Sequence, residues 1–241
     1  MALLAGCPRC TASVTAAGDG WSCPEHGGIR PVWRPDRSAY DAFVEHLGLA
    51  DGFPTYLPWP LASDWWVADF GVVAAGPGDD HATGELERPI EGQTGSQTGS
   101  QAWATLTAVA GTSLEDGDVE VLIVTEEAGV GLGSRCARVL GSTPGPELGR
   151  PAAWIRVGGQ QVPLWTVGLW QQDGPGGPGG QEGEEWDRSV LVGEVEGRWL
   201  WLVFRPASAM LMLGPEWALR DVSGLGMSLV ELPFGGGNGG W

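Results

Sequence analysis

The stretch Val119–Thr125, which reads VEVLIVT, decides the fold class of this chain. It is rich in β-branched residues and almost continuously apolar, which is typical of a strand covered on both faces of a sheet. The stretch therefore predicts a strand inside a sheet.

Other segments of the chain also have the composition of strands. Only Glu196 and Gly197 separate two of them, which predicts a two-residue hairpin. The expected architecture is a β-dominated α+β fold, in which a small zinc ribbon precedes a mixed or antiparallel β-rich domain with few short helices. The further predicted strands are residues 65–74, 101–111, 153–157, 161–167, 189–195, 198–204, 209–213 and 227–232.

One helix is predicted over residues 38–48, with Ser38 as its N-cap and Gly48 beyond its end. His46 near the end is expected to be partly charged, because a cationic imidazole suits the negative end of the helix dipole. The apolar residues expected to face the main domain are spaced i, i+3, i+4 and i+7, and they are Tyr40, Phe43, Val44 and Leu47.

A metal-ligand pattern, C-x2-C-x12-C-x2-H, occupies the N-terminal segment and consists of Cys7, Cys10, Cys23 and His26. A two-residue gap lets a tight turn direct two ligands at one ion. Three thiolates and an imidazole favour zinc over the hard cations, and a closed set of four ligands predicts a structural role. The alternatives are four unrelated residues or a Cys7–Cys10 disulfide. Residues 1–35 are thus predicted to form a zinc-ribbon-like module, and residues 36–241 a β-rich domain of unknown function.

The residues Leu4-Ala5-Gly6-Cys7 also resemble a lipoprotein cleavage site. A signal peptide requires a positively charged start and roughly 7–15 apolar residues, and neither precedes Cys7. No stretch approaches the about 20 apolar residues of a transmembrane helix. Cys136 is left as an odd thiol, which fits a reducing compartment. The sequence therefore predicts a cytoplasmic protein that does not contact a membrane.

The charge of the chain argues against an extended nucleic-acid interface. Its 30 acidic residues outnumber 13 basic ones, giving a net charge of −17, and every basic residue is arginine. Neutralising phosphates requires a basic surface, which only the N-terminal arginines Arg9, Arg30, Arg34 and Arg37 approach. The 14 tryptophans are expected mainly to fill the core; a stacking platform for a sugar or a base is the alternative.

Two low-complexity segments, near residues 85–101 and 171–185, are predicted to be disordered insertions. The first contains GQTGSQTGSQ and the second QQDGPGGPGGQEGEE. Neither composition can bury enough apolar surface to offset the entropy lost on ordering.

A glycine-rich turn, residues 126–135, follows the strand at 119–125. A strand, such a turn and a short helix, expected at 134–140, form a layout that can hold phosphate at a helix N-terminus. Ser134 stands where the G-x-G-x-x-G motif requires its third glycine, so a tight turn that needs positive φ is the simpler interpretation. The candidate ligand-binding residues are Glu126, Glu127, Gly131, Gly133 and Arg135. No catalytic motif is recognised elsewhere, so the sequence leans against an enzyme and no catalytic residue is assigned.

Four segments together resemble an uncharacterised family of actinobacterial cytoplasmic proteins with an N-terminal zinc-ribbon-like motif. The resemblance implies a zinc ribbon and no activity. It rests on CPRC and CPEH, LPWPLASDWWVADFG, VLIVTEEAGVGLGSRCARVLGSTPGPELG, and DRSVLVGEVEGRWLWLVFRPASAMLMLGPEWALRDVSGLGMSLVELPFG.

These observations favour a cytoplasmic zinc-ribbon protein that acts as a protein–protein interaction or regulatory module, with a structural zinc ion and an unknown protein partner. One alternative is a protein or enzyme that binds a phosphate or acyl ligand at the glycine-rich turn. A second alternative is weak nucleic-acid binding through the ribbon.

Overall fold

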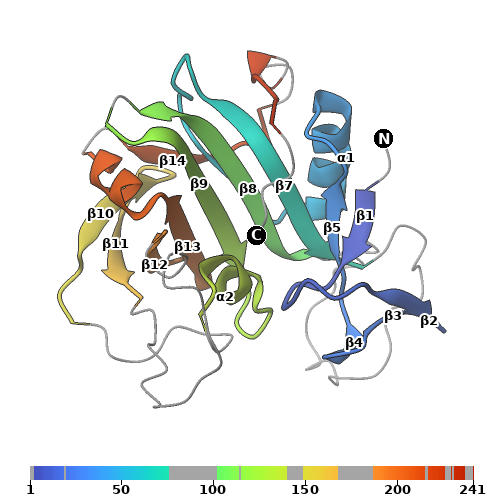
Figure 1. Ribbon diagram of the computed structural model, residues 1–241. Helices are drawn as coiled ribbons and strands as arrows, with labels where there is room; N and C mark the ends of the chain where they lie inside the picture. The colour runs from blue at the N-terminus through green and yellow to red at the C-terminus, as the bar shows by residue number, and fades with distance from the viewer. Residues whose placement is uncertain are drawn as a thin grey trace, which may run out of the picture.

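The computed structural model describes residues 3–18, 20–75, 102–113, 115–139, 149–167, 187–214, 217–225, 229, 231–236 and 241. The two predicted insertions, near residues 85–101 and 171–185, lie outside the described residues. The described chain is dominated by one mixed sheet of eleven strands, accompanied by a three-stranded sheet and three short helices (Figure 1). The predicted β-dominated α+β class is therefore confirmed.

The elements have the following bounds. The large sheet runs, in spatial order, β1 (Leu3–Gly6), β5 (Val32–Pro35), β7 (Trp66–Ala74), β8 (Ala102–Ser113), β9 (Gly117–Glu126), β13 (Arg198–Arg205), β12 (Ser189–Val195), β11 (Gln160–Thr166), β10 (Ala153–Val157), β14 (Ala218–Asp221) and β6 (Tyr56–Pro58). The small sheet comprises β2 (Thr15–Ala17), β3 (Gly20–Cys23) and β4 (Gly27–Ile29). The helices are α1 (Tyr40–Ala50), α2 (Leu132–Ala137) and the 3-10 helix η1 (Ala207–Met212).

Strand β9, which contains VEVLIVT, lies in the middle of the large sheet. It pairs antiparallel with β8 on one side and with β13 on the other. Its residues alternate between two apolar clusters: Val121 and Ile123 belong to one, and Leu122 and Val124 to the other. The prediction of a strand covered on both faces is confirmed.

The β12–β13 hairpin is also confirmed. Val195 pairs with Arg198, so only Glu196 and Gly197 form the loop. Their φ angles are 54° and 80°, the left-handed values that a two-residue hairpin of the favoured type requires. Gly197 takes this conformation without steric cost, which explains the glycine at the second loop position.

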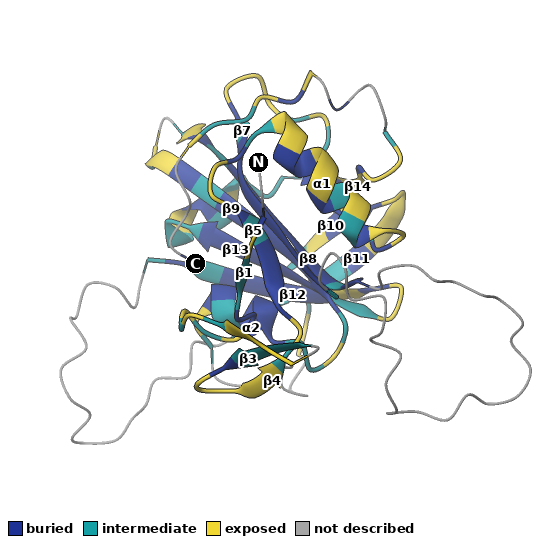
Figure 2. Ribbon diagram, turned by 90° about the vertical axis from the view of Figure 1, so that its right-hand side faces the viewer, coloured by how far each residue is buried: buried dark blue, intermediate teal, exposed yellow. Residues whose placement is uncertain are grey.

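The large sheet curls, so that its far edge packs across its middle. The hydroxyls of Thr105 and Thr107, both on β8, donate to the backbone oxygens of Pro54 and Tyr56 at 2.6 Å. Helix α1 closes the interior of the curled sheet by packing against β7, while α2 packs on the opposite face against β9 and β13. Figure 2 shows the buried strands between these two helices.

Helix α1 differs from its prediction in its ends and in its buried face. Its N-cap is Ala39 rather than Ser38, whose hydroxyl donates instead to the Ala68 backbone oxygen at 2.6 Å, and the helix continues past Gly48 to Ala50. Of the four residues predicted to face the domain only Phe43 is fully buried, because the buried face runs through Ala42, Phe43, His46 and Ala50. Tyr40 and Val44 are exposed.

His46 lies inside the core, and the predicted partial charge is wrong. Its ring stacks on Phe43 with an interplanar angle of 8°, and its Nε2 lies 3.3 Å from the Thr55 hydroxyl oxygen. Burial lowers the pKa of His46 to about 3, because the charged imidazole cannot be solvated there. The side chain is therefore neutral at physiological pH.

The C-terminal part of the chain also corrects two predicted strands. Residues 209–213 lie within or just after the 3-10 helix η1 instead of forming a strand. Of residues 227–232, only Leu229, Glu231 and Leu232 are described, and none of the three is in a strand. The unpredicted β14 pairs parallel with β10 and antiparallel with β6, which makes the sheet mixed.

The N-terminal segment is joined to the large sheet. Strands β1 and β5 pair with each other, and β5 pairs with β7, so only β2, β3 and β4 project as a separate small sheet. Strand β5 ends at Pro35, the predicted end of the ribbon-like module. Among the described helices, none combines the length and apolar character needed to cross a bilayer.

Candidate metal centre

The four residues of the C-x2-C-x12-C-x2-H pattern meet at the junction of the two sheets. Cys7 follows directly after β1, and Cys10 lies on the next turn. Cys23 ends β3, and the His26 amide donates to the Cys23 backbone oxygen at 3.3 Å in the tight turn that leads to β4. Gly27 completes that turn at a φ of 68°, a value that other residues rarely adopt. We refer to Cys7, Cys10, Cys23 and His26 as the Cys3His cluster.

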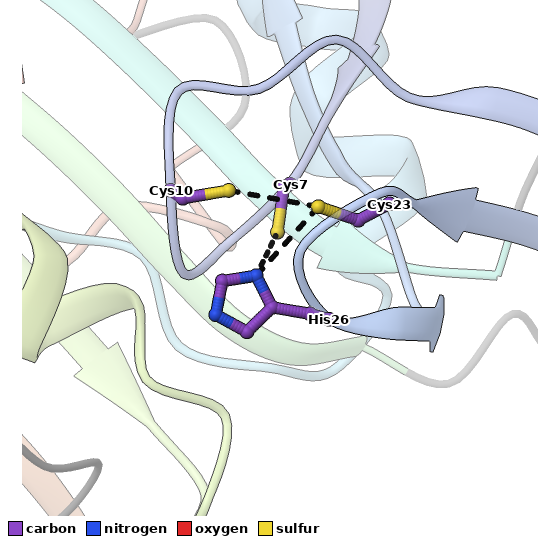
Figure 3. A group of neighbouring side chains, drawn as sticks. All are labelled: Cys7, Cys10, Cys23 and His26. Atoms are coloured by element: carbon purple, nitrogen blue, oxygen red, sulfur yellow. Dashed lines mark hydrogen bonds between the residues drawn. The ribbon is translucent and has the colours of Figure 1, made fainter.

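The ligand atoms of the cluster converge on one point, as Figure 3 shows. His26 Nδ1 lies 3.6 Å from the sulfur of Cys7 and 3.6 Å from that of Cys23. The sulfurs of Cys10 and Cys23 are also 3.6 Å apart, and all four ligand atoms lie within 4.8 Å of one another. All four cysteines of the chain are free thiols, so the structure has no Cys7–Cys10 disulfide. The cluster can hold a metal ion.

The protein surroundings already distinguish the thiols of the cluster. Burial raises the pKa of Cys7 to about 11, although the Arg9 backbone amide donates to its sulfur at 3.4 Å. For Cys23, burial opposes ionisation, but the hydrogen bond with His26 and nearby backbone amides lower the pKa to about 6. A bound divalent cation deprotonates coordinating thiols, so the cluster would carry thiolates once loaded.

The glycine-rich turn, residues 126–135, packs directly on the first knuckle. The Arg9 guanidinium donates through Nη2 to the backbone oxygen of Gly129 at 2.8 Å and through Nε to that of Val130 at 3.2 Å. Arg135, at the end of the turn, donates in return through Nη1 to the backbone oxygen of Cys7 in the first knuckle. The structure thus brings together the two regions that the sequence singled out separately.

Glu126 occupies the position at which an anion would bind to α2. Its carboxylate Oε2 accepts hydrogen bonds from the backbone amides of Leu132 at 2.8 Å and Gly133 at 3.2 Å. Burial raises the pKa of Glu126 to about 7, against the lowering effect of these amides. The α2 N-terminus therefore already has a carboxylate acceptor from its own chain.

The glycines of the turn have steric roles. Gly131, the N-cap of α2, has a φ of 88°, as the positive-φ interpretation predicts. A Cβ atom on Gly133 would lie 2.3 Å from the ring of the fully buried Trp201, so only glycine allows α2 to approach β13. Helix α2 begins at Leu132 and ends at Ala137, earlier at both ends than the predicted 134–140. Glu127 accepts a hydrogen bond from Arg198 Nε at 2.9 Å.

The metal-ligand pattern did not indicate the residues that support the cluster from other parts of the chain. Arg135 also donates through Nη2 to the Trp241 backbone oxygen at 3.1 Å, and the Trp241 indole donates to Asp69 Oδ2 at 2.7 Å. The guanidinium of Arg34 lies 4.3 Å from the Trp241 ring centroid and also contacts Asp69. Only tertiary contacts reveal these residues, because they lie far apart in the chain.

Comparison with known proteins gives one family match. A family model matches residues 1–86 and 91–238, and its description is "Family of unknown function (DUF6758)". No curated protein and no solved structure matches the chain. The predicted resemblance to an uncharacterised family is thereby confirmed, and the match carries no activity with it.

Proposed function

Since the chain belongs to a family of unknown function, DUF6758, we propose its role from its own geometry: the Cys3His cluster binds one structural zinc ion. The convergence of the four ligand atoms carries this proposal. Zinc prefers sulfur and nitrogen donors in a tetrahedral arrangement, whereas magnesium and calcium require oxygen donors.

The distances within the cluster support zinc. Zinc–sulfur bonds of about 2.3 Å and zinc–nitrogen bonds of about 2.0 Å at tetrahedral angles separate two sulfurs by about 3.8 Å, and a sulfur from a nitrogen by about 3.5 Å. The corresponding distances in the protein are 3.6 Å for Cys10–Cys23 and 3.6 Å for each of the two contacts of His26 Nδ1. Four protein ligands complete the coordination, so the ion would hold the fold together rather than activate a substrate.

Metal analysis of the full chain tests this role. We expect about one zinc ion per chain, lost together with thermal stability when a strong chelator is added. Cys10→Ser should lose the ion, and Cys136→Ala is the matched control because Cys136 is a core thiol that is not one of the four ligands. Zinc that is absent from the wild type, or retained equally by Cys10→Ser, would contradict the assignment.

We propose further that the protein is a protein–protein interaction or regulatory module of the cytoplasm. Apolar side chains on the exposed face of α1 support this role: Tyr40 and Val44 are 39% and 47% exposed, and Leu4 on the edge strand β1, which contacts α1, is 58% exposed. Exposed apolar groups beside an unpaired strand edge are typical of protein-binding surfaces. A reducing compartment is proposed because metal-binding thiols must stay reduced.

The interaction role is tested by cross-linking the tagged full chain in its host cell and identifying the captured proteins. A partner that binds this surface should be captured by the wild type and by Glu45→Gln, which changes an exposed residue of the same helix. Val44→Glu should lose it. Equal capture by Val44→Glu would place any partner elsewhere, and an absence of specific partners would contradict the role.

Nucleic-acid binding through the ribbon has less support than protein binding. Two of the four N-terminal arginines make contacts within the chain, since Arg9 donates to the glycine-rich turn and Arg34 contacts Asp69. They are therefore less available to neutralise phosphates along a polymer. If the protein is retained on DNA at low salt and released at high salt, the result would support nucleic-acid binding.

A further inference from the structure

A cleft of about 720 Å³ separates the small sheet from the glycine-rich turn. One wall is formed by β3, β4 and the following Arg30, and the other by Trp103 of β8 together with residues 127–130. This volume lies within the range of small-molecule sites, about 300–1,000 Å³. The cleft is distinct from the Cys3His cluster, although Arg9 of the first knuckle lines it.

Arg30 presents a guanidinium with free donors to this cleft. Its Cζ lies 3.9 Å from the centroid of the Trp103 ring, so the guanidinium of this exposed residue stacks on the indole. Within the described part of the chain, no hydrogen bond or ion pair to the Arg30 side chain is present. A stacked guanidinium with free N–H groups is suited to bidentate binding of a carboxylate or a phosphate.

The other charged groups of the cleft leave it positive. Arg9 contributes a second cation, which its two hydrogen bonds to the turn hold in place. Glu127 is the acidic residue among those that line the cleft, and its carboxylate is paired with Arg198 at 2.9 Å. A positive cleft in a chain of net charge −17 attracts anions locally, whereas the surrounding protein repels them.

Trp21 gives the cleft an apolar surface in addition to Trp103, on which Arg30 stacks. Its ring is held edge-on against Trp33, with centroids 5.5 Å apart and an interplanar angle of 90°, and it is only partly buried. Partly exposed, fixed indoles are favourable surfaces for flat apolar groups. Trp21 and Trp103 each pack against a core cluster, and being only partly buried they also line the cleft.

We propose that this cleft binds a small oxyanion ligand that carries a flat apolar group. Arg30, assisted by Arg9, binds the phosphate or carboxylate, and Trp21 contacts the flat group. The ligand is small because a polyanion would extend from the cleft onto the acidic surface of the chain, where like charges repel it. This site goes beyond the proposed structural zinc and protein-interaction roles.

Isothermal titration calorimetry of the zinc-loaded full chain tests the site with four probes. ADP has both parts of the proposed ligand, pyrophosphate only the phosphates, and adenosine only the flat group; indole-3-acetate replaces phosphate by carboxylate. We expect ADP or indole-3-acetate to bind with a dissociation constant below about 1 mM, and whichever binds more tightly identifies the anion. Pyrophosphate and adenosine should each bind at least tenfold more weakly.

Arg30→Gln should weaken the binding of the better probe at least tenfold. Arg156→Gln is the matched control, because Arg156 is an exposed arginine of β10 outside the cleft. Zinc content, measured on every sample, separates a failure of this site from a failure of the metal proposal. Absence of binding by all four probes, equal binding of adenosine and ADP, or unchanged affinity in Arg30→Gln would overturn the proposal.

Discussion

The guanidinium of Arg9 donates a 2.8 Å hydrogen bond to the backbone oxygen of Gly129, joining residues 120 positions apart. Arg9 lies between the first two cysteines of the Cys3His cluster, and Gly129 lies in the turn that follows the central strand β9. This contact, together with the hydrogen bond from Arg135 to the Cys7 backbone oxygen, fixes the first knuckle on the large sheet. The glycine-rich turn therefore supports the cluster.

The first prediction concerns this support. Arg9→Gln removes the two hydrogen bonds to the turn while leaving the four ligands in place. Because each such bond contributes about 1 kcal/mol, the loss of both should weaken zinc binding by up to about thirtyfold in competition with a chelator. Arg156→Gln, an exposed arginine without these contacts, serves as control. An unchanged zinc affinity in Arg9→Gln would show that the turn does not support the knuckle.

The second prediction concerns the close approach of α2 to β13. Gly133→Ala places a methyl group 2.3 Å from the buried ring of Trp201, and such overpacking should lower the free energy of unfolding by about 1–3 kcal/mol. Gly48→Ala is the contrasting control: Gly48 has open space around it in α1, so the substitution should stabilise by up to about 1 kcal/mol. Urea unfolding of both variants measures the difference. The account fails here if the two substitutions have the same effect.

The third prediction concerns the pH dependence that His46 imposes. The pKa of His46 is about 3 in the folded protein and 6.5 ordinarily, so below pH 6.5 the unfolded chain binds a proton that the folded protein excludes. Stability should fall with decreasing pH between 6.5 and 3, by up to about 1.4 kcal/mol per pH unit. His46→Gln should remove this part of the slope. Urea unfolding at pH 7, 6 and 5 measures the free energy of unfolding of both proteins. An equal pH dependence in the wild type and in His46→Gln would contradict the prediction.

The fourth prediction has the opposite sign and concerns Glu126. Burial raises its pKa to about 7 from 4.5, so the folded protein retains a proton that the unfolded chain releases. This contribution to stability is complete below pH 4.5 and is lost as the pH rises through 7, by up to about 1.4 kcal/mol per unit. Glu126→Gln keeps an acceptor for the amides of Leu132 and Gly133. It should therefore match the wild type near pH 5 and exceed its stability at pH 8, as denaturant titrations at both values can check.

The features that the sequence predicted correctly are those that short segments determine. The composition of Val119–Thr125 is sufficient for a buried strand, and Glu196-Gly197 is sufficient for a hairpin, because both depend on neighbouring residues. The spacing of Cys7, Cys10, Cys23 and His26 likewise identified residues that the fold brings together. Ligand pairs separated by two residues form within local turns, which is why their pattern is readable in a sequence.

The features that could not be predicted depend on contacts between distant segments. The packing of the knuckle on the glycine-rich turn joins Arg9 to Gly129. The composition of neither segment predicts this contact. The buried face of α1 was misplaced because polar His46 enters the core beside Phe43 and Phe70, where aromatic contacts compensate for burying its ring. Strand β14 was missed because its four residues, only one of them fully buried, acquire their geometry from pairing with β10 and β6.

The most direct test of the central claim is X-ray absorption spectroscopy at the zinc edge of the loaded full chain. The account predicts three sulfur ligands at about 2.3 Å and one nitrogen ligand at about 2.0 Å, with no oxygen. In Cys10→Ser the number of sulfur ligands should fall. A first coordination shell that contains water or carboxylate oxygen in the wild type, or a spectrum that does not change in Cys10→Ser, would contradict a structural Cys3His zinc site.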